Sequence, residues 1–540
     1  MFTLLPFNAL AASPIQGPPD RLPQQEIPKD LDITKPQTLK ITPIDVPKVD
    51  QSSSTLRTMT PSKFEIVGLQ VLPSTEMQAL LDPMLGKKLT LAQIVEGVTK
   101  VTAYLQAKGY VLSYAYLPAQ DFKNRIVKVA IVEGYLSEIN IQGNAGSAEK
   151  MIREIGQKLL NERPLTRGTF EYYSQVFAQL NGIQVAISAQ PSPSFEAGTP
   201  LNIVVNRKAI DATVGIVPGL SGLDQVLTMT TNSLTSLAEQ ITLTVIPSSE
   251  NKYIGLNYVQ PVGTEGAKLL MQASYNNNQQ NNSLFDQLGL KYEASNQRLG
   301  VFYSTPFIFA ATKQLTGSIG LYGDDRSDVY SSKLNGQSVN IQTDSRVLAT
   351  ELNGFLGVKD YQMQGSLGVF KGLETLGANQ VNGGILDLDF IRFRGQASVS
   401  YLQTSGFGWS ASTVAQYSND VLPVSEKIAF GGRFFGQGYP LGEASGDGGY
   451  AAMLEANYNF NLNVQYLSYI QPYVFTDTAR TYLNNIGSQS RSLASVGVGL
   501  RVSNRKNYNL DVNVAKPVGE EPINQNNRLP RINFSYYFAF

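Results

Sequence analysis

From about Ala212 to Phe540, apolar and polar residues alternate with a period of two, which is the pattern of β-strands that have one apolar and one polar face. The last ten residues, RINFSYYFAF, place five apolar or aromatic side chains on one face and end in Phe540. No run of about 18 apolar residues occurs, so we expect no transmembrane helix. Alternation of this kind is typical of an outer-membrane β-barrel.

The number of strands follows only loosely from the length of this region. A membrane-spanning β-strand needs about 9–11 residues plus a turn, so residues 212–540 give roughly 20 residues to each of sixteen strands. Any number from about fourteen to eighteen strands fits the same arithmetic. The polar stretches 276–283 and 324–337 are expected to be extracellular loops, and residues 261–266 to be a tight periplasmic turn.

An internal repeat with a period of roughly 75 residues precedes this region. Phe64–Gly68 (FEIVG) corresponds to Ile139–Gly143 (INIQG), and each segment starts a unit that reads strand, helix, helix, strand, strand. In the first unit, we expect Thr90 to cap a helix whose apolar face recurs at helical spacing through Ile94, Val98, Val101 and Leu105. The pattern predicts two tandem α+β domains.

A glycine-rich stretch interrupts the strand pattern at residues 429–450, AFGGRFFGQGYPLGEASGDGGY, which holds eight glycines in 22 residues. Glycine costs backbone entropy inside a regular strand or helix, so we expect a long loop with tight turns. Long ordered loops are usually functional. The alternative is a glycine-rich surface loop without a special role.

Several residues of this stretch carry a family resemblance. They are Gly431, Gly432, Arg433, Gly436, Gln437, Gly438, Tyr439, Gly442, Glu443, Gly446 and Asp447. Their pattern resembles the signature loop of two-partner secretion transporters, the ShlB/FhaC/HecB (TpsB) family within the outer-membrane assembly superfamily. The usual core of that loop is V-R-G-[FY], so this chain departs from it at Gln437, where the family has Arg. The repeat resembles POTRA domains, and Phe540 resembles the signal by which such barrels are inserted.

A second segment, residues 471–480, resembles the family's F-x-D-x-G strand motif through Phe475, Asp477, Ala479 and Arg480, with Ala479 where Gly is usual. Period-two alternation places Gln471, Tyr473, Phe475 and Asp477 on one face, which we expect to be the lumenal face. In relatives, the loop arginine pairs with this aspartate. Here Gln437 would give a weaker hydrogen bond, Arg433 or Arg480 would supply the missing charge, or Asp477 would be a solvated carboxylate.

The composition excludes several classes of site. The chain has no Cys and no His, so disulfides, thiolate sites, Ser-His-Asp triads and HExxH zinc sites cannot be built. Lys plus Arg (43) equals Asp plus Glu (43), which gives no indication of nucleic-acid binding. We therefore expect no enzyme activity, no cofactor and no metal.

The expected organisation has five parts. Residues 1–12 (MFTLLPFNALAA) resemble the end of a signal peptide without its positive n-region, and residues 13–61 form a Pro-rich linker with little room for a plug helix. POTRA domains at 62–135 and 136–210 follow, each with the order βααββ. Residues 211–540 form a transmembrane antiparallel β-barrel, for which the resemblance selects sixteen strands.

The resemblance implies an outer-membrane pore, with its POTRA domains in the periplasm. It would move an unfolded exoprotein, a haemolysin-like or adhesin-like client, to the cell surface without ATP. Its partners would be that client, outer-membrane lipid and the barrel-assembly machinery during insertion, and it would be a monomer. The alternatives are an assembly or insertase factor of the same superfamily and a passive porin.

Overall fold

The computed structural model describes residues 58–189, 198–219, 223–248, 251–280, 289–382, 386–403, 405–464, 466–484, 490–523 and 527–540. Contacts divide the chain into two units, one consisting mainly of Pro36–Arg207 and the other mainly of Lys208–Ser233 and Glu239–Phe540. The predicted signal-peptide segment 1–12 and nearly all of the Pro-rich segment 13–61, with the question of a plug helix, lie outside the described residues.

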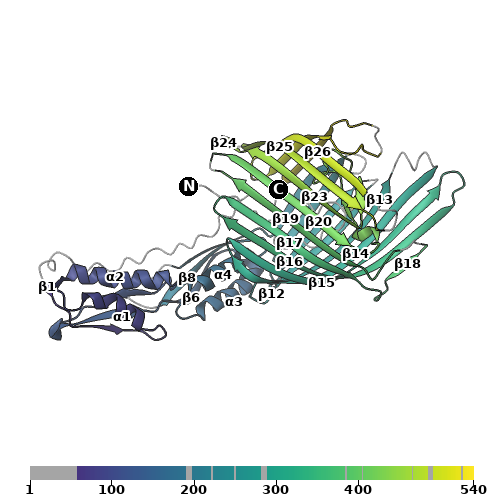
Figure 1. Ribbon diagram of the computed structural model, residues 1–540. Coiled ribbons are helices and arrows are strands. Elements are labelled where there is room, and N and C mark those ends of the chain that lie inside the picture. Colours follow the sequence, from purple (N-terminus) through teal and green to yellow (C-terminus); the bar gives the residue numbers. More distant parts are fainter. Residues whose placement is uncertain are drawn as a thin grey trace. The chain divides into compact units, whose positions relative to one another are not determined.

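The first unit begins with a domain of two helices on a three-stranded sheet (Figure 1). Its elements are β1 (Thr58–Met59), β2 (Lys63–Val67), α1 (Thr75–Leu81), η1 (Asp82–Met84), β3 (Leu89–Thr90), α2 (Leu91–Ala107), β4 (Tyr114–Tyr116), η2 (Lys123–Arg125) and β5 (Ile126–Val132). The sheet order is β2-β5-β4, and β1 pairs with β3. Thr90 caps α2 as expected, because its hydroxyl accepts from the Gln93 amide at 3.3 Å and the Gln93 side chain accepts from the Thr90 amide at 2.8 Å.

The second domain of this unit repeats the same order of elements. They are β6 (Tyr135–Gly143), η3 (Gly146–Ala148), α3 (Glu149–Leu160), α4 (Arg167–Ala178), β7 (Ile183–Ala189) and β8 (Gly198–Arg207), with sheet order β6-β8-β7. Backbone hydrogen bonds join the two domains: the Arg167 amide donates to the Gly109 carbonyl at 2.7 Å, and the Leu165 amide donates to the Gly134 carbonyl at 3.0 Å.

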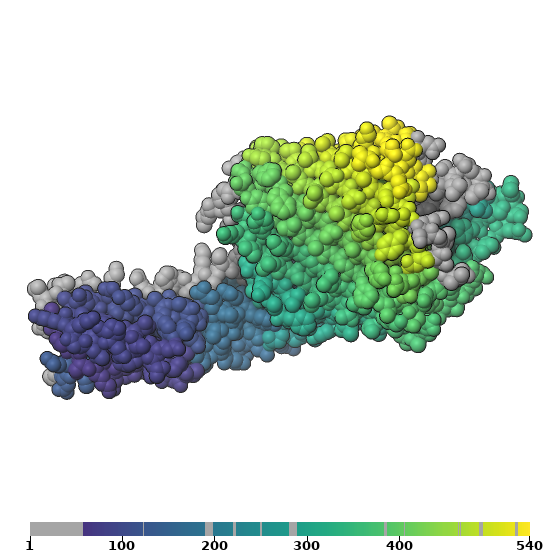
Figure 2. All heavy atoms as spheres, in the orientation of Figure 1, coloured from purple at the N-terminus to yellow at the C-terminus, as the bar shows by residue number. Residues whose placement is uncertain are grey.

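The second unit is a closed antiparallel barrel of sixteen long strands in the described residues, which confirms the expected number (Figure 1). The strands are β9 (Ile210–Pro218), β10 (Leu223–Asn232), β11 (Gln240–Pro247), β12 (Asn251–Val262), β13 (Ala267–Gln280), β14 (Leu290–Ala310), β15 (Lys313–Ser332), β16 (Ser338–Val358), β17 (Tyr361–Gly372), β19 (Ile391–Leu402), β20 (Phe407–Ser418), β23 (Gly448–Tyr458), β25 (Leu467–Tyr482), β26 (Ser490–Ser503), β27 (Tyr508–Pro517) and β28 (Arg531–Ala539). Short segments β18 (Asn379–Val381) and β24 (Phe460–Val464) add pairings to β16 and β25. Pairing of β28 with β9 closes the ring. On the face that Figure 2 shows, the barrel strands coloured green to yellow form a continuous outer surface.

The two faces of the barrel wall follow the predicted alternation. Along β25, Gln471, Tyr473, Phe475 and Asp477 are buried on the lumenal side, whereas the residues between them are exposed. At the seam, the Phe540 amide donates to the Ala212 carbonyl at 3.0 Å and the Phe540 side chain is 68% exposed. None of the helices in the described residues is long and apolar enough to cross a membrane.

The prediction of loops from polar stretches was partly wrong. β13 extends through residue 280, and β15 extends through residue 332, into both stretches that were expected to be extracellular loops. The reason is that polar residues there face the lumen: Asn276, Asn278 and Asp324, for example, are buried. The turn expected at 261–266 is confirmed, since β12 ends at Val262 and β13 begins at Ala267.

Candidate functional site

The segment between β20 and β23 is the candidate site. It holds η4 (Val424–Glu426) and a small hairpin formed by β21 (Ile428–Phe430) and β22 (Ala444–Gly446), and we call residues 419–447 the lumenal loop. The sequence-based boundary at 450 was too late, because Gly448–Tyr450 already belong to β23. The loop turns tightly at its tip, where the Gly431 amide donates to the Phe435 carbonyl at 2.8 Å and the Gly432 amide to the Tyr439 carbonyl at 3.1 Å.

Three successive backbone amides fasten the loop tip to the barrel wall. The Gly436 amide donates to Asp477 Oδ1 at 2.9 Å, and the Gln437 amide donates to Asp477 Oδ2 at 3.1 Å. The Gly438 amide donates to Ser495 Oγ on β26 at 2.9 Å. Asp477 is only 3% exposed, so its carboxylate is held by amide dipoles in a buried site. We call this contact the tip anchor.

The Gln437 side chain does not make the expected contact with Asp477. Its Oε1 accepts from Asn513 Nδ2 at 3.2 Å, and its Nε2 donates to Met453 Sδ at 3.3 Å. Neither arginine supplies the charge: Arg433 donates to the Tyr537 hydroxyl at 2.9 Å, and Arg480 donates to Ser490 Oγ at 3.2 Å. Arg480 occupies an exposed, outward position of β25, which explains why it cannot reach a lumenal carboxylate.

Two glycines explain why the backbone can approach so closely. A Cβ atom at Gly438 would lie 2.6 Å from the Pro517 nitrogen, which is a backbone atom that cannot move aside cheaply. Gly431 has a φ of 112°, a conformation that side chains rarely adopt. The glycine content of the loop therefore reflects close approach and turning, as the sequence suggested.

An apolar seat lies beneath the tip. Tyr439 is fully buried, and its hydroxyl donates to the Glu520 carbonyl at 2.8 Å. The buried residues around it are Val414, Ile428, Phe430, Ala444, Ala451, Ala479 and Leu493. The Ala479 methyl group, at the position where the family usually has Gly, is thus part of this seat.

The predicted carboxylates of the loop hold its two flanks. Asp447 is fully buried, pairs with Lys427 Nζ at 2.9 Å and accepts from the Leu422 and Asn484 amides, each at 2.9 Å. Glu443, which follows the positive-φ residue Gly442, pairs with Arg491 of β26 at 2.6 Å. Both carboxylates are structural in this arrangement.

A second anchor, which the sequence did not reveal, fixes the start of the loop to a second group of strands. The Glu426 carboxylate is 1% exposed and accepts from Arg392 of β19 at 2.6 Å and from the Tyr322 hydroxyl of β15 at 2.8 Å. Arg298 of β14 lies 3.4 Å from it and also pairs with Asp324. We call this contact the base anchor. Glu426 precedes the glycine-rich stretch, so no local signal marked it.

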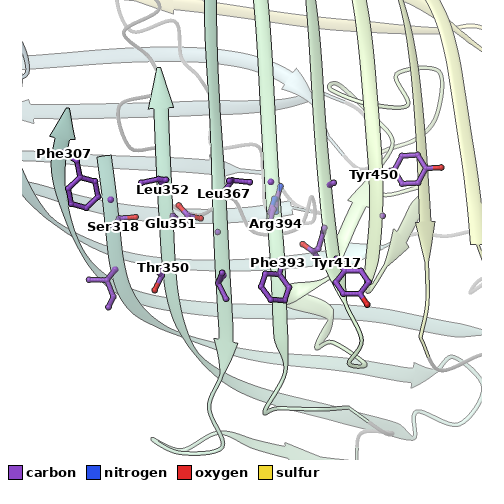
Figure 3. Close-up of a pocket in the computed structure, with 18 of the residues that line it drawn as sticks. Phe307, Ser318, Thr350, Glu351, Leu352, Leu367, Phe393, Arg394, Tyr417 and Tyr450 are labelled. Atoms are coloured by element: carbon purple, nitrogen blue, oxygen red, sulfur yellow. The ribbon is translucent and has the colours of Figure 1, made fainter. Parts of the chain in front are cut away.

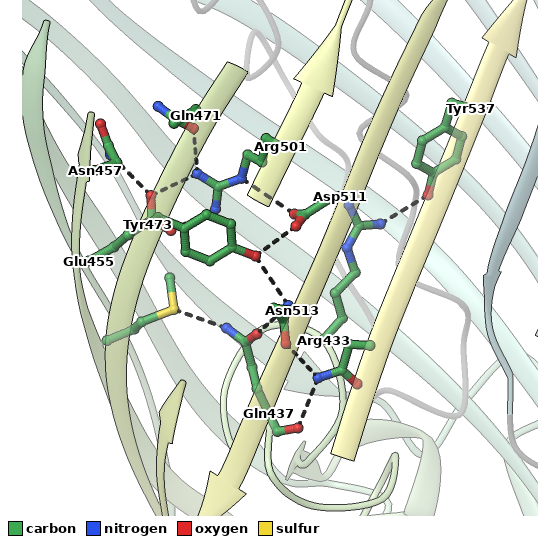
Figure 4. A network of polar contacts seen from close by, with 12 residues as sticks. Arg433, Gln437, Glu455, Asn457, Gln471, Tyr473, Arg501, Asp511, Asn513 and Tyr537 are labelled. Atoms are coloured by element: carbon green, nitrogen blue, oxygen red, sulfur yellow. Dashed lines mark hydrogen bonds and ion pairs between the residues drawn. The ribbon is translucent and has the colours of Figure 1, made fainter. Parts of the chain in front are cut away.

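A polar network extends from the tip anchor along β23–β27 (Figure 4). Asn513, which donates to Gln437, also donates to the Tyr473 hydroxyl at 3.2 Å. Arg501 pairs with Glu455 through two contacts of 2.7 and 2.6 Å. The Tyr473 hydroxyl and Arg501 share the Asp511 carboxylate, at 2.6 and 3.4 Å. The Gln437 side chain is therefore connected to Asp511 through the Asn513 amide and the Tyr473 hydroxyl.

Comparison with known proteins identifies the family. Residues 223–502, more than half of the chain, match the family described as haemolysin secretion/activation protein ShlB/FhaC/HecB. The chain belongs to this family. Residues 59–134 match the ShlB-type POTRA domain. As a ShlB/FhaC/HecB protein, it is a two-partner secretion transporter of exoproteins in the outer membrane, with its POTRA domain in the periplasm.

Similar proteins agree with this family membership. The Heme/hemopexin transporter protein HuxB of Haemophilus influenzae (strain 86-028NP) is 19% identical over 490 residues, which cover 84% of each chain. CdiB from Escherichia coli has a TM-score of 0.72 at 17% identity, covering 98% of this chain and all of that one. CdiB from Acinetobacter baumannii has a TM-score of 0.62 at 14% identity, with coverages of 89% and 90%. At these identities, the structural likenesses show the fold alone.

Proposed function

We propose that this ShlB/FhaC/HecB protein passes one unfolded exoprotein through its barrel without ATP, and that the lumenal loop is the gate. The observation that carries the proposal is the attachment of one loop to two groups of barrel strands. Asp477 and Ser495 hold the tip on β25 and β26, and Glu426 holds the base through β14, β15 and β19. A loop fastened in this way crosses the lumen, so an extended client requires one anchor to release.

The tip anchor is the better candidate for the release step. Its two hydrogen bonds to Asp477 contribute about 3–6 kcal/mol in total, but they come from amides of a glycine-rich turn, which can move away without leaving a cation unpaired. The base anchor combines a buried carboxylate with two arginines, and breaking such a cluster leaves uncompensated buried charge at a cost of about 3–5 kcal/mol. The base anchor therefore keeps the start of the lumenal loop attached to the barrel wall, and the loop tip moves away from β25 and β26 when the client passes.

The N-terminal unit would capture the client. The second domain has the βααββ order of the first, so we assign POTRA domains to residues 62–135 and 136–210. In each three-stranded sheet, the two outer strands leave backbone groups that an extended client can pair with by strand addition. Capture and transfer of this kind involve no bond chemistry, so we assign the protein no enzyme activity.

The test is secretion of an exoprotein encoded beside this gene, in cells that make or lack the protein. Full-length protein should deliver the client to the medium, and a variant that lacks residues 62–208 should leave the client in the periplasm although the barrel is inserted. If secretion is unchanged but other outer-membrane barrels fall in abundance, the protein is an assembly factor and the proposal is wrong.

A further inference from the structure

A groove of about 1030 Å³ lies on the outward face of the barrel wall, across strands β14–β25 (Figure 3). Outward-facing side chains surround it, among them Leu367, Phe393, Tyr417 and Tyr450, each about half or more exposed. Surface of this kind is unfavourable in water and favourable against hydrocarbon. In a barrel of the outer membrane, this face meets lipid.

Strand register gives the groove a small floor and tall walls. Leu367, Gly395, Ala415 and Tyr450 lie directly opposite one another on consecutive strands, so Gly395 and Ala415 form a floor between two large side chains. In the next row, Phe393 lies opposite Tyr417 and closes the groove at one end. A slot with a narrow floor fits an unbranched hydrocarbon chain better than it fits a folded partner.

Aromatic side chains at two levels of the barrel wall, one at Tyr361, Tyr401 and Trp409 and the other at Tyr417, fix the depth of the groove in the membrane. Tyr361, Tyr401 and Trp409 are in mutual ring contact near the end of the barrel where β9 begins, which is the periplasmic end. The strand advances roughly 27 Å along its own axis from Trp409 to Tyr417. At the usual tilt of barrel strands, this corresponds to roughly 20 Å along the membrane normal. These rings therefore mark the two interfaces, and the part of the groove around Gly395 and Ala415, six residues from Tyr401 and Trp409 along their strands, lies in the outer half.

A cation lies beside the groove. Arg480 is opposite Tyr450 in the strand register and is exposed on the same outward face. Although it belongs to the strand motif that the sequence singled out, it takes no part in the lumenal site. A long basic side chain near the end of a transmembrane strand extends its charge to the headgroup region.

We propose that this groove is a binding site for one lipopolysaccharide molecule of the outer leaflet. An acyl chain lies over Gly395 and Ala415, between the walls formed by Leu367 and Tyr450, and Arg480 binds a phosphate of the headgroup. The combination of an apolar slot with an adjacent exposed cation matches a phosphorylated, multiply acylated lipid.

The experiment measures lipids that remain bound to the full-length protein after extraction in mild detergent and repeated washing, by native mass spectrometry. Wild type should retain one lipopolysaccharide per barrel. The variant Gly395→Leu with Ala415→Phe fills the floor, and a Cβ at Gly395 has no atom closer than 3.1 Å. Retention should fall about tenfold, as expected when about two methylene groups lose their burial.

The matched control is Gly354→Leu with Ala273→Phe, which enlarges outward residues that do not line the groove. It should retain lipid like wild type, and both variants should still migrate as folded barrels before heating. Arg480→Gln, which leaves the wall intact, should lower lipopolysaccharide retention, and Arg480→Lys should restore it. Equal retention by wild type and the filled variant, equal loss in the control, or retention of phospholipid instead would overturn the proposal.

Discussion

The tip anchor makes a sharp prediction about two neighbouring positions. Because the Gly436 and Gln437 contacts to Asp477 come from backbone amides, removal of the carboxylate should release the tip, whereas removal of the Gln437 side chain should not. Asp477→Ala and Gln437→Ala are therefore the informative pair. A pairing through the residue-437 side chain would make the two variants equivalent.

The magnitudes separate the two outcomes clearly. Asp477→Ala removes two hydrogen bonds to a charged acceptor, worth about 1.5–3 kcal/mol each, and so about 3–6 kcal/mol in total. That loss raises the population of the released tip by about 10²–10⁴-fold. Gln437→Ala removes one neutral hydrogen bond to Asn513 and a weak contact to Met453, which together contribute about 1 kcal/mol and change that population by less than about tenfold.

Hydrogen exchange of the loop amides measures this population directly. A peptide that covers residues 434–439 reports the amides of the anchor, and a peptide from α2 serves as the internal control. Asp477→Ala should remove protection from the first peptide only, and Gln437→Ala should leave it nearly as in wild type. If Gln437→Ala removes as much protection as Asp477→Ala, the backbone anchor is refuted.

Three further predictions concern the base anchor, two glycines of the lumenal loop and the helix cap at Thr90. Glu426→Ala removes the carboxylate that pairs with Arg392 and one of the two carboxylates that contact Arg298, so the denaturation midpoint of the purified barrel should fall, corresponding to about 3–5 kcal/mol. An unchanged midpoint would contradict the base anchor. Gly438→Ala should expose the tip amides to hydrogen exchange, because the structure has no room for a Cβ atom at this position. A Cβ atom at Gly442 would face open space, so Gly442→Ala should cost only about 1–2 kcal/mol of local backbone strain. Equal exchange of the tip amides in both variants would argue against close packing at Gly438. Thr90→Ala removes a helix cap and should destabilise the first POTRA domain by about 1 kcal/mol in urea unfolding, with the barrel unaffected.

Local patterns predicted those parts of the molecule that local forces determine. Alternation with period two is sufficient to assign the lumenal face of β25, because successive side chains of a strand must point to opposite sides. The helix cap at Thr90 was predictable for the same reason, since donor and acceptor lie within three residues. The polar stretches at 276–283 and 324–337 misled the prediction, because a barrel has a polar interior and polarity there does not distinguish lumen from loop.

The base anchor could not be predicted, because its partners are distant in the sequence. Glu426 contacts residues 104 and 128 positions away, and only the closed barrel brings those strands under the loop. The role of position 437 was hidden for a different reason. A sequence displays side chains, whereas the tip anchor is made by main-chain amides that every residue except proline possesses.

This difference explains why the tip anchor needs no arginine at position 437. A buried carboxylate needs donors, and three amides in a tight turn can supply them to Asp477 and Ser495 without any cation. The constraint then moves from the side chain of residue 437 to its glycine neighbours, because only glycine lets the turn approach β25–β27 closely enough. Backbone shape, rather than the side chain of residue 437, makes the tip anchor, and that side chain contacts the polar network through Asn513 instead.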